Sequence, residues 1–232
     1  MAKPPIRHRV IRTRNKHSRA VLRDGTILIR LARNLSVTEE REHIRDLLQR
    51  MTRYAIEESR RTVIHPFRTV LNGGQSVTVT LATGKKYTFA LEPGDRTTTK
   101  KIRGGWKITV GPGLKRRGLH GILWDLIAEA EFPRIEALVH RLNESTYCAR
   151  ISQVKMKFAS SQWGSCSPRG VIMVNAALLL LPPRLLKYII IHELAHRRRA
   201  DHSDAFWREV EWGMPSYASA RKELHEYRLP TL

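Results

Sequence analysis

The chain has 232 residues, of which 41% are apolar and 7% aromatic, a composition typical of a folded protein with one large domain or two smaller ones. Lys and Arg number 42 against 21 Asp and Glu, and the resulting net charge of +21 favours anionic partners, nucleic acid among them. Collagen-like, coiled-coil and disordered chains are excluded. No apolar run reaches the roughly 18 residues of a membrane span, so no membrane partner is expected.

The cysteine content and the N-terminal segment indicate where the protein works. Cys148 and Cys166 are too few for a disulfide scaffold, which predicts a reducing compartment. Residues 1–23 contain eight Lys and Arg, no acid and no apolar run, so a secretory signal is not expected and we interpret them as a basic arm before the first strand. The predicted location is the cytoplasm.

The pattern of the first half of the chain predicts a β-rich region with one helix. Residues 17–32 predict a hairpin that turns at Asp24-Gly25. Ser36, with a glutamate three residues later, forms a capping box that opens a helix running to about Arg60. Alternating segments at 75–82, 85–91 and 100–110 then predict a three-stranded β-meander.

A Gly-Pro-Gly break at 111–113 separates this half from the rest. We therefore expect a β-rich region at 1–112 and a catalytic region at 113–232, which together can also form one continuous domain. A helical pattern spans about 118–142, where Pro133 is expected to kink or split it. Strands are predicted at 152–160 and 171–174 with a turn between them, and helices fill the remainder.

The chemistry is concentrated in His192-Glu193-Leu194-Ala195-His196. Helical residues four apart share a face, so both imidazoles can bind one metal ion. Glu193 projects about 100° further round the helix, where a general base can take a proton from metal-bound water. The preceding segment, 185–191, is almost wholly apolar, which indicates a buried helix whose polar side chains need partners. A zinc ion is such a partner; hydrogen-bonded core histidines are the plainer alternative.

A third ligand is needed, because catalytic zinc usually has three protein ligands. His202 is the preferred candidate, with a glutamate or His225 as alternatives. His202 lies ten residues after His192, so a continuous helix would turn it away from the other two. We therefore expect the helix to end near 198–200 and the chain to swing back through a polar turn, with residue 203 or 204 capping the next helix.

Further motifs surround this segment in a fixed order. They are Trp163-Gly164-Ser165-Cys166-Ser167 between two strands, a strand ending in Asn175, a proline-led helix with the His-Glu motif, and His202-Ser203 before Phe206-Trp207. Over most of the chain, this series resembles the YgjP-like metallopeptidase family, which is related to the SprT and WLM zinc peptidases. The resemblance implies an α+β, zincin-like fold, in which a β-rich N-terminal half with one helix precedes an active-site helix against a small sheet. It also implies zinc ligands at His192, His196 and His202, with Glu193 catalytic.

Five residues are candidates for substrate binding: Trp163, Gly164, Ser165, Tyr188 and Arg197. An edge strand at 163–165 can pair with an extended substrate, and the alternative is a tight turn that packs the tryptophan on the helix. Tyr188 is either a core residue or a donor to the transition state. Arg197 begins a run of three arginines where family members usually show an apolar residue first. Such a run favours an anionic substrate or, equally, a solvated helix end.

Three further residues are expected to hold the site in position without binding metal or substrate. Asn175 is a candidate for hydrogen bonds to nearby backbone, and Phe206 and Trp207 are expected to anchor the following helix and so hold His202 in place. Cys166 is interpreted as a buried thiol, with metal ligation as the alternative.

These observations predict a zinc-dependent hydrolase, with a peptidase acting through metal-activated water as the leading hypothesis. The first alternative keeps the metal but hydrolyses a nucleoside triphosphate, because the charge and the arginine run favour an anionic nucleotide. The second is a nucleic-acid-associated module or a peptidase recruited to DNA. It would use Lys100, Lys101 and Arg103 as a basic face and Trp106 as a stacking aromatic.

Overall fold

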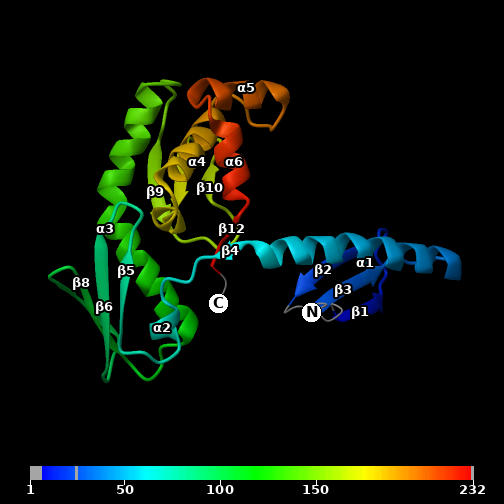
Figure 1. The fold of residues 1–232 in the computed structure, drawn as a ribbon, viewed down its shortest axis with the longest axis horizontal. Helices are drawn as coiled ribbons and strands as arrows, with labels where there is room; N and C mark the ends of the chain where they lie inside the picture. The colour runs from blue at the N-terminus through cyan, green and yellow to red at the C-terminus, as the bar shows by residue number, and fades with distance from the viewer. Residues whose placement is uncertain (1–6, 24–25, 231–232) are drawn as a thin grey trace. The chain divides into compact units, whose positions relative to one another are not determined.

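The computed structural model describes residues 7–23 and 26–230, and it confirms the predicted α+β fold (Figure 1). The chain divides into two compact units, residues 1–61 and 62–232, whereas the sequence suggested a division near residue 112. None of the helices in the described ranges combines the length and the apolarity that crossing a bilayer requires.

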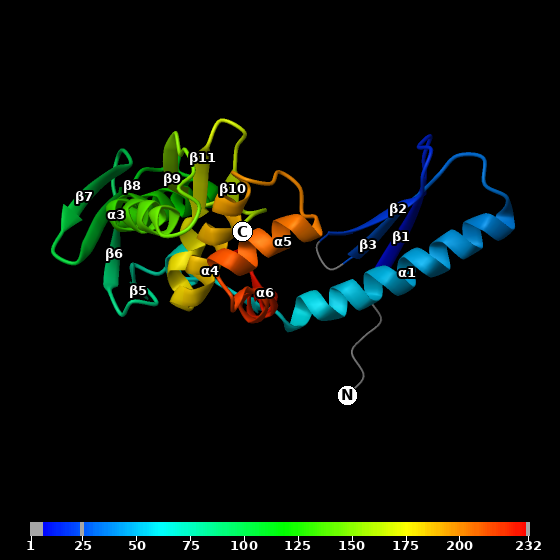
Figure 2. The same cartoon turned by 90° about the horizontal axis from the view of Figure 1, so that it is seen from above.

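The first unit is a three-stranded sheet with one helix on one face (Figure 2). Its elements are β1 (Arg7–Arg12), β2 (Arg19–Arg23), β3 (Thr26–Leu31) and α1 (Val37–Arg60). The predicted hairpin is confirmed as the antiparallel pair β2–β3, although its Asp24-Gly25 turn lies outside the described residues. The basic arm contains a strand that was not predicted: β1 pairs in parallel with β3. Most residues of β1 are exposed.

Helix α1 begins and ends where the sequence predicted. The Ser36 side chain accepts a hydrogen bond from the Glu39 backbone N–H, and the Glu39 carboxylate accepts one from the Ser36 N–H at 2.7 Å, which completes the capping box. Apolar side chains of α1 pack on the strand residues Ile27, Ile29 and Leu31, each with no exposed surface. This small core lies between α1 and one face of the sheet.

The second unit contains a four-stranded sheet, a three-stranded sheet, a two-stranded sheet and the remaining helices. Its elements are β4 (Thr62–Val63), α2 (Arg68–Leu71), β5 (Ser76–Thr80), β6 (Lys86–Pro93), β7 (Thr98–Ile102), β8 (Gly105–Val110), α3 (Arg116–Glu144), β9 (Gln153–Lys157), β10 (Gly164–Cys166), β11 (Val171–Asn175), the 3-10 helix η1 (Ala176–Leu180), α4 (Pro183–Ala195), α5 (Asp204–Gly213), α6 (Tyr217–Leu224) and β12 (Tyr227–Arg228).

The expected meander is wrong in its connectivity. The strand order is β5-β6-β8-β7: β6 pairs with β5 in antiparallel fashion, as expected, but its other neighbour is β8, which runs parallel to it, and not β7, the next strand in the sequence. The predicted single strand at 100–110 is split by a turn at Gly104, whose φ of +75° suits glycine, so that β7 folds back along the outer side of β8. Trp106 is 7% exposed and stacks on Phe89, with 5.2 Å between ring centroids. It is therefore not available to stack on a nucleic-acid base, as the nucleic-acid hypothesis expected.

Helix α3 runs without interruption through Pro133 and lies along the four-stranded and three-stranded sheets of this unit (Figure 1). Its Trp124 is fully buried and stacks on Phe158 at 4.9 Å. On the same helix, the Glu131 carboxylate is 1% exposed and is bound by the side chains of Lys85, Tyr87 and Arg134. These contacts tie α3 to the four-stranded sheet.

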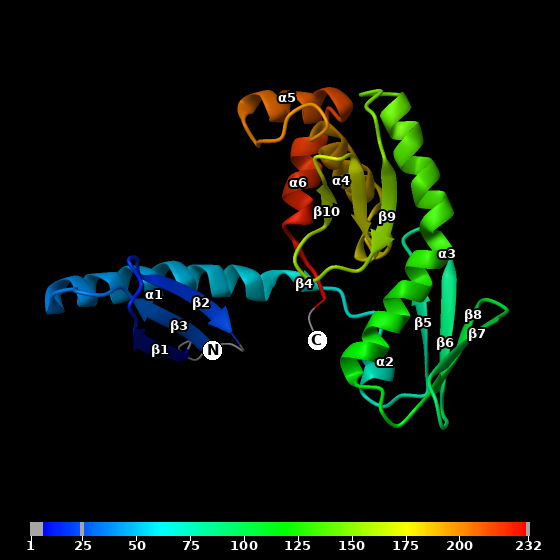
Figure 3. The same ribbon diagram turned by 180° about the vertical axis from the view of Figure 1, so that it is seen from behind.

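The second sheet positions the His-Glu helix. Its order is β10-β11-β9, with β9 parallel and β10 antiparallel to β11, so β10 is an edge strand, which is one of the two alternatives that the sequence left open for residues 163–165. Helix α4 packs against β10 and β11 on one side and against α5 and α6 on others (Figure 3). Because it is enclosed in this way, three successive isoleucines, residues 189–191, are all buried.

Candidate metal centre

His192 and His196 lie at the C-terminal end of the buried helix α4. His192 is in the last turn, and His196 is the C-cap residue. The helix therefore ends a few residues before the predicted 198–200, and hydrogen bonds to the carbonyls of residues 194 and 195 tighten the chain there. A polar loop then brings His202 back in front of α5, so the predicted reversal of the chain is present.

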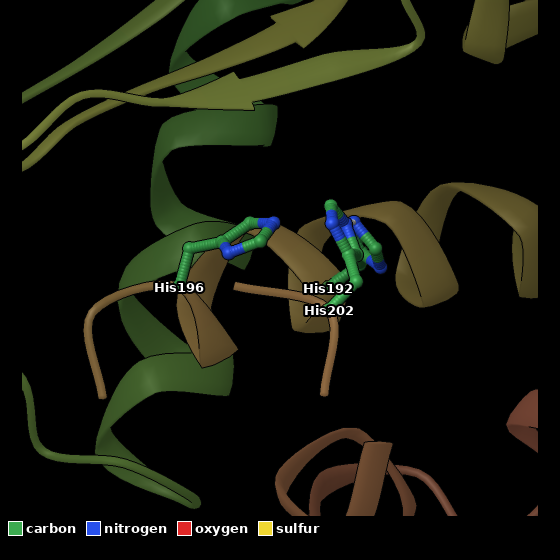
Figure 4. A group of neighbouring side chains, drawn as sticks. All are labelled: His192, His196 and His202. Carbon is green, nitrogen blue, oxygen red and sulfur yellow. Dashed lines mark hydrogen bonds between the residues drawn. The ribbon is translucent and has the colours of Figure 1, made fainter. Parts of the chain in front are cut away.

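The three imidazoles converge (Figure 4). Each offers one nitrogen, and the three nitrogens all lie within 4.8 Å of one another. The His192 Nε2 is 3.2 Å from the His202 Nε2. His225, Glu209 and Glu211, the competing third ligands suggested by the sequence, are not part of this group, and neither is Cys166.

The neutral forms of His192 and His196 are favoured, which suits the binding of a cation. Burial, followed by the neighbouring His196 and His202, lowers the pKa of His192 to about 3, so that its ring is neutral. Burial also lowers the pKa of His196. The Nδ1 of His196 lies 3.0 Å from the Arg199 carbonyl and must donate its proton there, which leaves Nε2 as a free lone pair. Neutral imidazoles with fixed orientation are the ligand type that zinc prefers.

Two aromatic side chains of α5 pack against the three histidines. Phe206 of α5 is fully buried and lies 4.4 Å, 4.9 Å and 4.8 Å, ring centroid to ring centroid, from His196, His192 and His202 respectively. Trp207 is farther from the rings, 5.8 Å from His192 and 6.0 Å from His202. The predicted aromatic pair therefore packs directly against the imidazoles.

Glu193 is the buried carboxylate beside this cluster. It is 5% exposed, and burial raises its pKa to about 8. It faces Gly164 of β10: a Cβ built on that glycine would lie 2.7 Å from the Glu193 Oε1 and 2.8 Å from the Cγ2 of Ile189. The strand can approach the helix this closely only because residue 164 has no side chain.

Asn175 fixes the segment that leads into β10. Its side chain has no exposed surface; the Nδ2 donates to the carbonyls of Ala159 and Gln162, at 2.7 Å each, and the Oδ1 accepts from the Ala177 N–H. The Asn175 N–H donates to the Trp163 carbonyl. These bonds hold residues 159–163, and through them the edge strand, against the rest of the sheet.

The other predicted substrate-binding residues occupy different positions. Trp163 and Ser165 are half-buried on the edge segment. Tyr188 is 4% exposed, its ring lies 6.0 Å from that of His192, and burial raises its pKa to about 12. Arg197 donates to the carbonyls of Arg150, Ser167 and Pro168, which joins the end of α4 to two loops.

One charged residue near the cluster was not singled out from the sequence. The Arg221 guanidinium of α6 lies over the Trp207 ring, 4.2 Å from its centroid, and its charge also lowers the pKa of His192. Nothing in the sequence marks Arg221 among the 42 basic residues, because its place depends on how α6 packs.

Similarity to a known protein family points in the same direction. The family model described as a YgjP-like metallopeptidase domain matches residues 16–227. One solved structure, the crystal structure of the metallopeptidase zymogen of Pyrococcus abyssi abylysin, is 26% identical over 41% of this chain and 99% of that chain, with a TM-score of 0.34. Among curated proteins, none matches the chain.

Proposed function

This chain belongs to the YgjP-like metallopeptidase family, and from that premise we propose that it is a zinc peptidase whose ion is held by His192, His196 and His202. The observation that carries the proposal is the convergence of three imidazoles beside one buried carboxylate. Three protein ligands are the donor set typical of catalytic zinc sites, whereas structural zinc sites usually have four. When bound, zinc makes water more acidic and polarises a carbonyl oxygen.

Glu193 is the proposed proton carrier. It takes a proton from the attacking water and returns it to the nitrogen of the leaving amine, which balances the proton over one hydrolysis. Its buried position favours this work, because a carboxylate out of water binds a proton more strongly than an exposed one. A cation held by the three histidines would favour the ionised form of this carboxyl and so make it available as a base at neutral pH.

We place the substrate along β10. An edge strand presents unpaired backbone groups on its free side, and an extended peptide can add to it as a further strand. Residues 163–165 lie on this edge, and Gly164 is also the residue in contact with Glu193. A peptide bound there would run past the base, which gives both Trp163 and Ser165 a role in substrate binding.

Metal content and activity together test the proposal. Wild type, His202→Ala, Glu193→Gln and His225→Ala are purified without chelator, zinc is measured by mass spectrometry, and casein cleavage is followed. We expect one zinc per chain in wild type, an affinity weakened by more than about 100-fold in His202→Ala, and full zinc in the two other variants. Glu193→Gln should lose about 10²- to 10⁴-fold in rate, and His225→Ala should lose none. Wild type that binds no zinc, even when zinc is added, would overturn the proposal.

A second candidate, hydrolysis of a nucleoside triphosphate, is favoured by one feature. A cavity of about 320 Å³ near the end of α4 is lined by Arg198, Arg199 and Arg208, among others. Arg198 is already engaged, because it donates to the Tyr147 carbonyl and lies over two aromatic rings. The same protein preparation, assayed for phosphate or pyrophosphate release, distinguishes the two: Arg199→Gln should lower nucleotide hydrolysis and leave casein cleavage unchanged.

A further inference from the structure

The sheet of the first unit has one covered and one open face. Paired residues on neighbouring strands point to the same side of a sheet, so the strand register assigns each side chain to a face. The core residues Ile27 and Ile29 face α1, and the residues between them therefore face away. This open face consists of nine residues in three rows: Arg7, Thr26 and Arg23; Arg9, Leu28 and Val21; Ile11, Arg30 and Arg19.

Five of these nine residues are arginine and none is acidic, whereas the average composition of the chain would place fewer than two basic residues there. Four of the five are exposed and Arg30 is half-buried. Arg19 and Arg30 are directly opposite each other in the register, although like charges in such pairs destabilise a sheet. Stability of the fold alone does not explain this arrangement.

On the covered face of the same sheet, in contrast, an arginine is paired with an acidic residue. Arg12 of β1 points to the α1 side, and its guanidinium binds the Glu40 carboxylate through two hydrogen bonds of 2.9 Å and 2.7 Å. Within the described ranges, no arginine of the open face has an ion pair of 4.0 Å or less. Five guanidinium groups are therefore left for an external anion.

We propose that the open face binds the phosphate backbone of double-stranded nucleic acid without sequence preference. The guanidinium fork matches phosphate oxygens, and each such contact releases counterions from the duplex. Strands about 4.8 Å apart and same-face residues about 6.8 Å apart spread these groups over roughly 10 by 14 Å, enough to contact phosphates on both sides of a minor groove about 6 Å wide. The face carries no aromatic residue, so it does not provide a platform for unstacked bases.

A membrane surface is the competing occupant, and the apolar residues of the face argue against it. Ile11 and Val21 are only 36% and 37% exposed, and no aromatic side chain lies on the face to enter the headgroup region. The proposal does not depend on the catalytic site, because none of the nine residues belongs to the second unit.

The test is the salt dependence of duplex binding by the full-length chain. Fluorescence anisotropy of a labelled DNA duplex of mixed sequence gives the affinity between about 50 and 200 mM NaCl. The variant is Arg9→Gln/Arg19→Gln/Arg23→Gln. The matched control is Arg41→Gln/Arg45→Gln/Arg53→Gln, which removes the same charge from exposed positions of α1 that do not belong to the open face.

We expect the variant to bind the duplex about tenfold or more weakly at low salt, with a slope of log affinity against log salt shallower by about 2.7, and the control to stay within about twofold of wild type. Equal weakening of both variants would overturn the proposal, because it would mean that net charge alone attracts DNA. Absence of duplex binding would also overturn it. So would binding to phosphatidylserine vesicles that is lost in the variant while duplex binding is retained.

Discussion

The close approach of Gly164 to Glu193 makes Gly164→Ala a sharp test of the catalytic arrangement. The added Cβ would lie 2.7 Å from the Glu193 Oε1, 2.8 Å from the Ile189 Cγ2 and 2.9 Å from the Glu193 Cγ, whereas ordinary van der Waals contact begins at 3.4 Å. Each distance is thus short by about half an ångström or more. Because Ile189 is held in the buried helix α4, the glutamate and the edge strand are the parts that must move.

The expected result is a large loss of rate with little loss of metal. A displacement of about 1 Å in a reacting group can cost about 100-fold in rate, so kcat for casein or a fluorogenic peptide should fall by about that factor. Overpacking should also lower the free energy of unfolding by about 1–3 kcal/mol. Zinc content should remain at one per chain, because the three atoms nearest the added methyl group belong to Glu193 and Ile189 and not to a histidine.

Gly121→Ala is the matched control. Gly121 lies inside helix α3, and a Cβ there would meet nothing within 4 Å. This substitution should raise helix stability by about 0.5–1 kcal/mol and leave the rate unchanged. The reasoning is refuted if Gly164→Ala cleaves peptide at the wild-type rate, or if its rate falls only because zinc is lost.

Three further predictions concern the packing around the site and the acid stability of the fold. Phe206→Ala removes the ring that packs against the three imidazoles. We expect it to lower the free energy of unfolding, measured by chemical denaturation, by about 3–5 kcal/mol and to weaken zinc binding by about 10- to 100-fold in a chelator competition. Asn175→Ala removes the side chain that donates to two backbone carbonyls, so the melting temperature and the affinity for extended peptides should fall together, since the edge strand loses its support. For Glu131, burial raises the carboxyl pKa, but hydrogen bonds from its three partners outweigh burial and the net pKa is lowered. Its contribution to stability should therefore be present above about pH 4 and be lost as the pH falls through the lowered pKa, so that thermal melts of wild type and Glu131→Gln differ at pH 7 and converge in acid.

What the sequence predicted correctly depends on local chemistry. The capping box located the start of α1, because Ser36 and Glu39 lie within one helical turn. The spacing of His192 and His196 placed both rings on one helix face for the same reason. Strand positions in the second unit also followed from alternation, since each strand buries one face.

What the sequence could not predict depends on distant partners. Alternation identifies a strand but not its neighbour, so the parallel pairing of β6 with β8 was missed. Strand β1 was missed because it lies at an edge and buries little, which leaves no apolar alternation to detect. The demand for glycine at residue 164 arises from the approach of β10 to α4, two elements that meet only in the folded chain.

The run of three arginines after the motif has a structural role. This role explains why an arginine stands where the YgjP-like family usually has an apolar residue. Helix α4 ends at the second histidine of the motif, so the following loop must be held firmly if His202 is to return to the cluster. Arg197 binds three loop carbonyls, Arg198 binds a fourth, and the Arg199 carbonyl accepts from the His196 ring. The charged side chains thus connect the end of the helix to neighbouring loops through hydrogen bonds, where an apolar residue would rely on packing. Because one of these bonds also sets the tautomer of His196, the loop that returns His202 to the cluster also orients the His196 ring, the second of the proposed ligands.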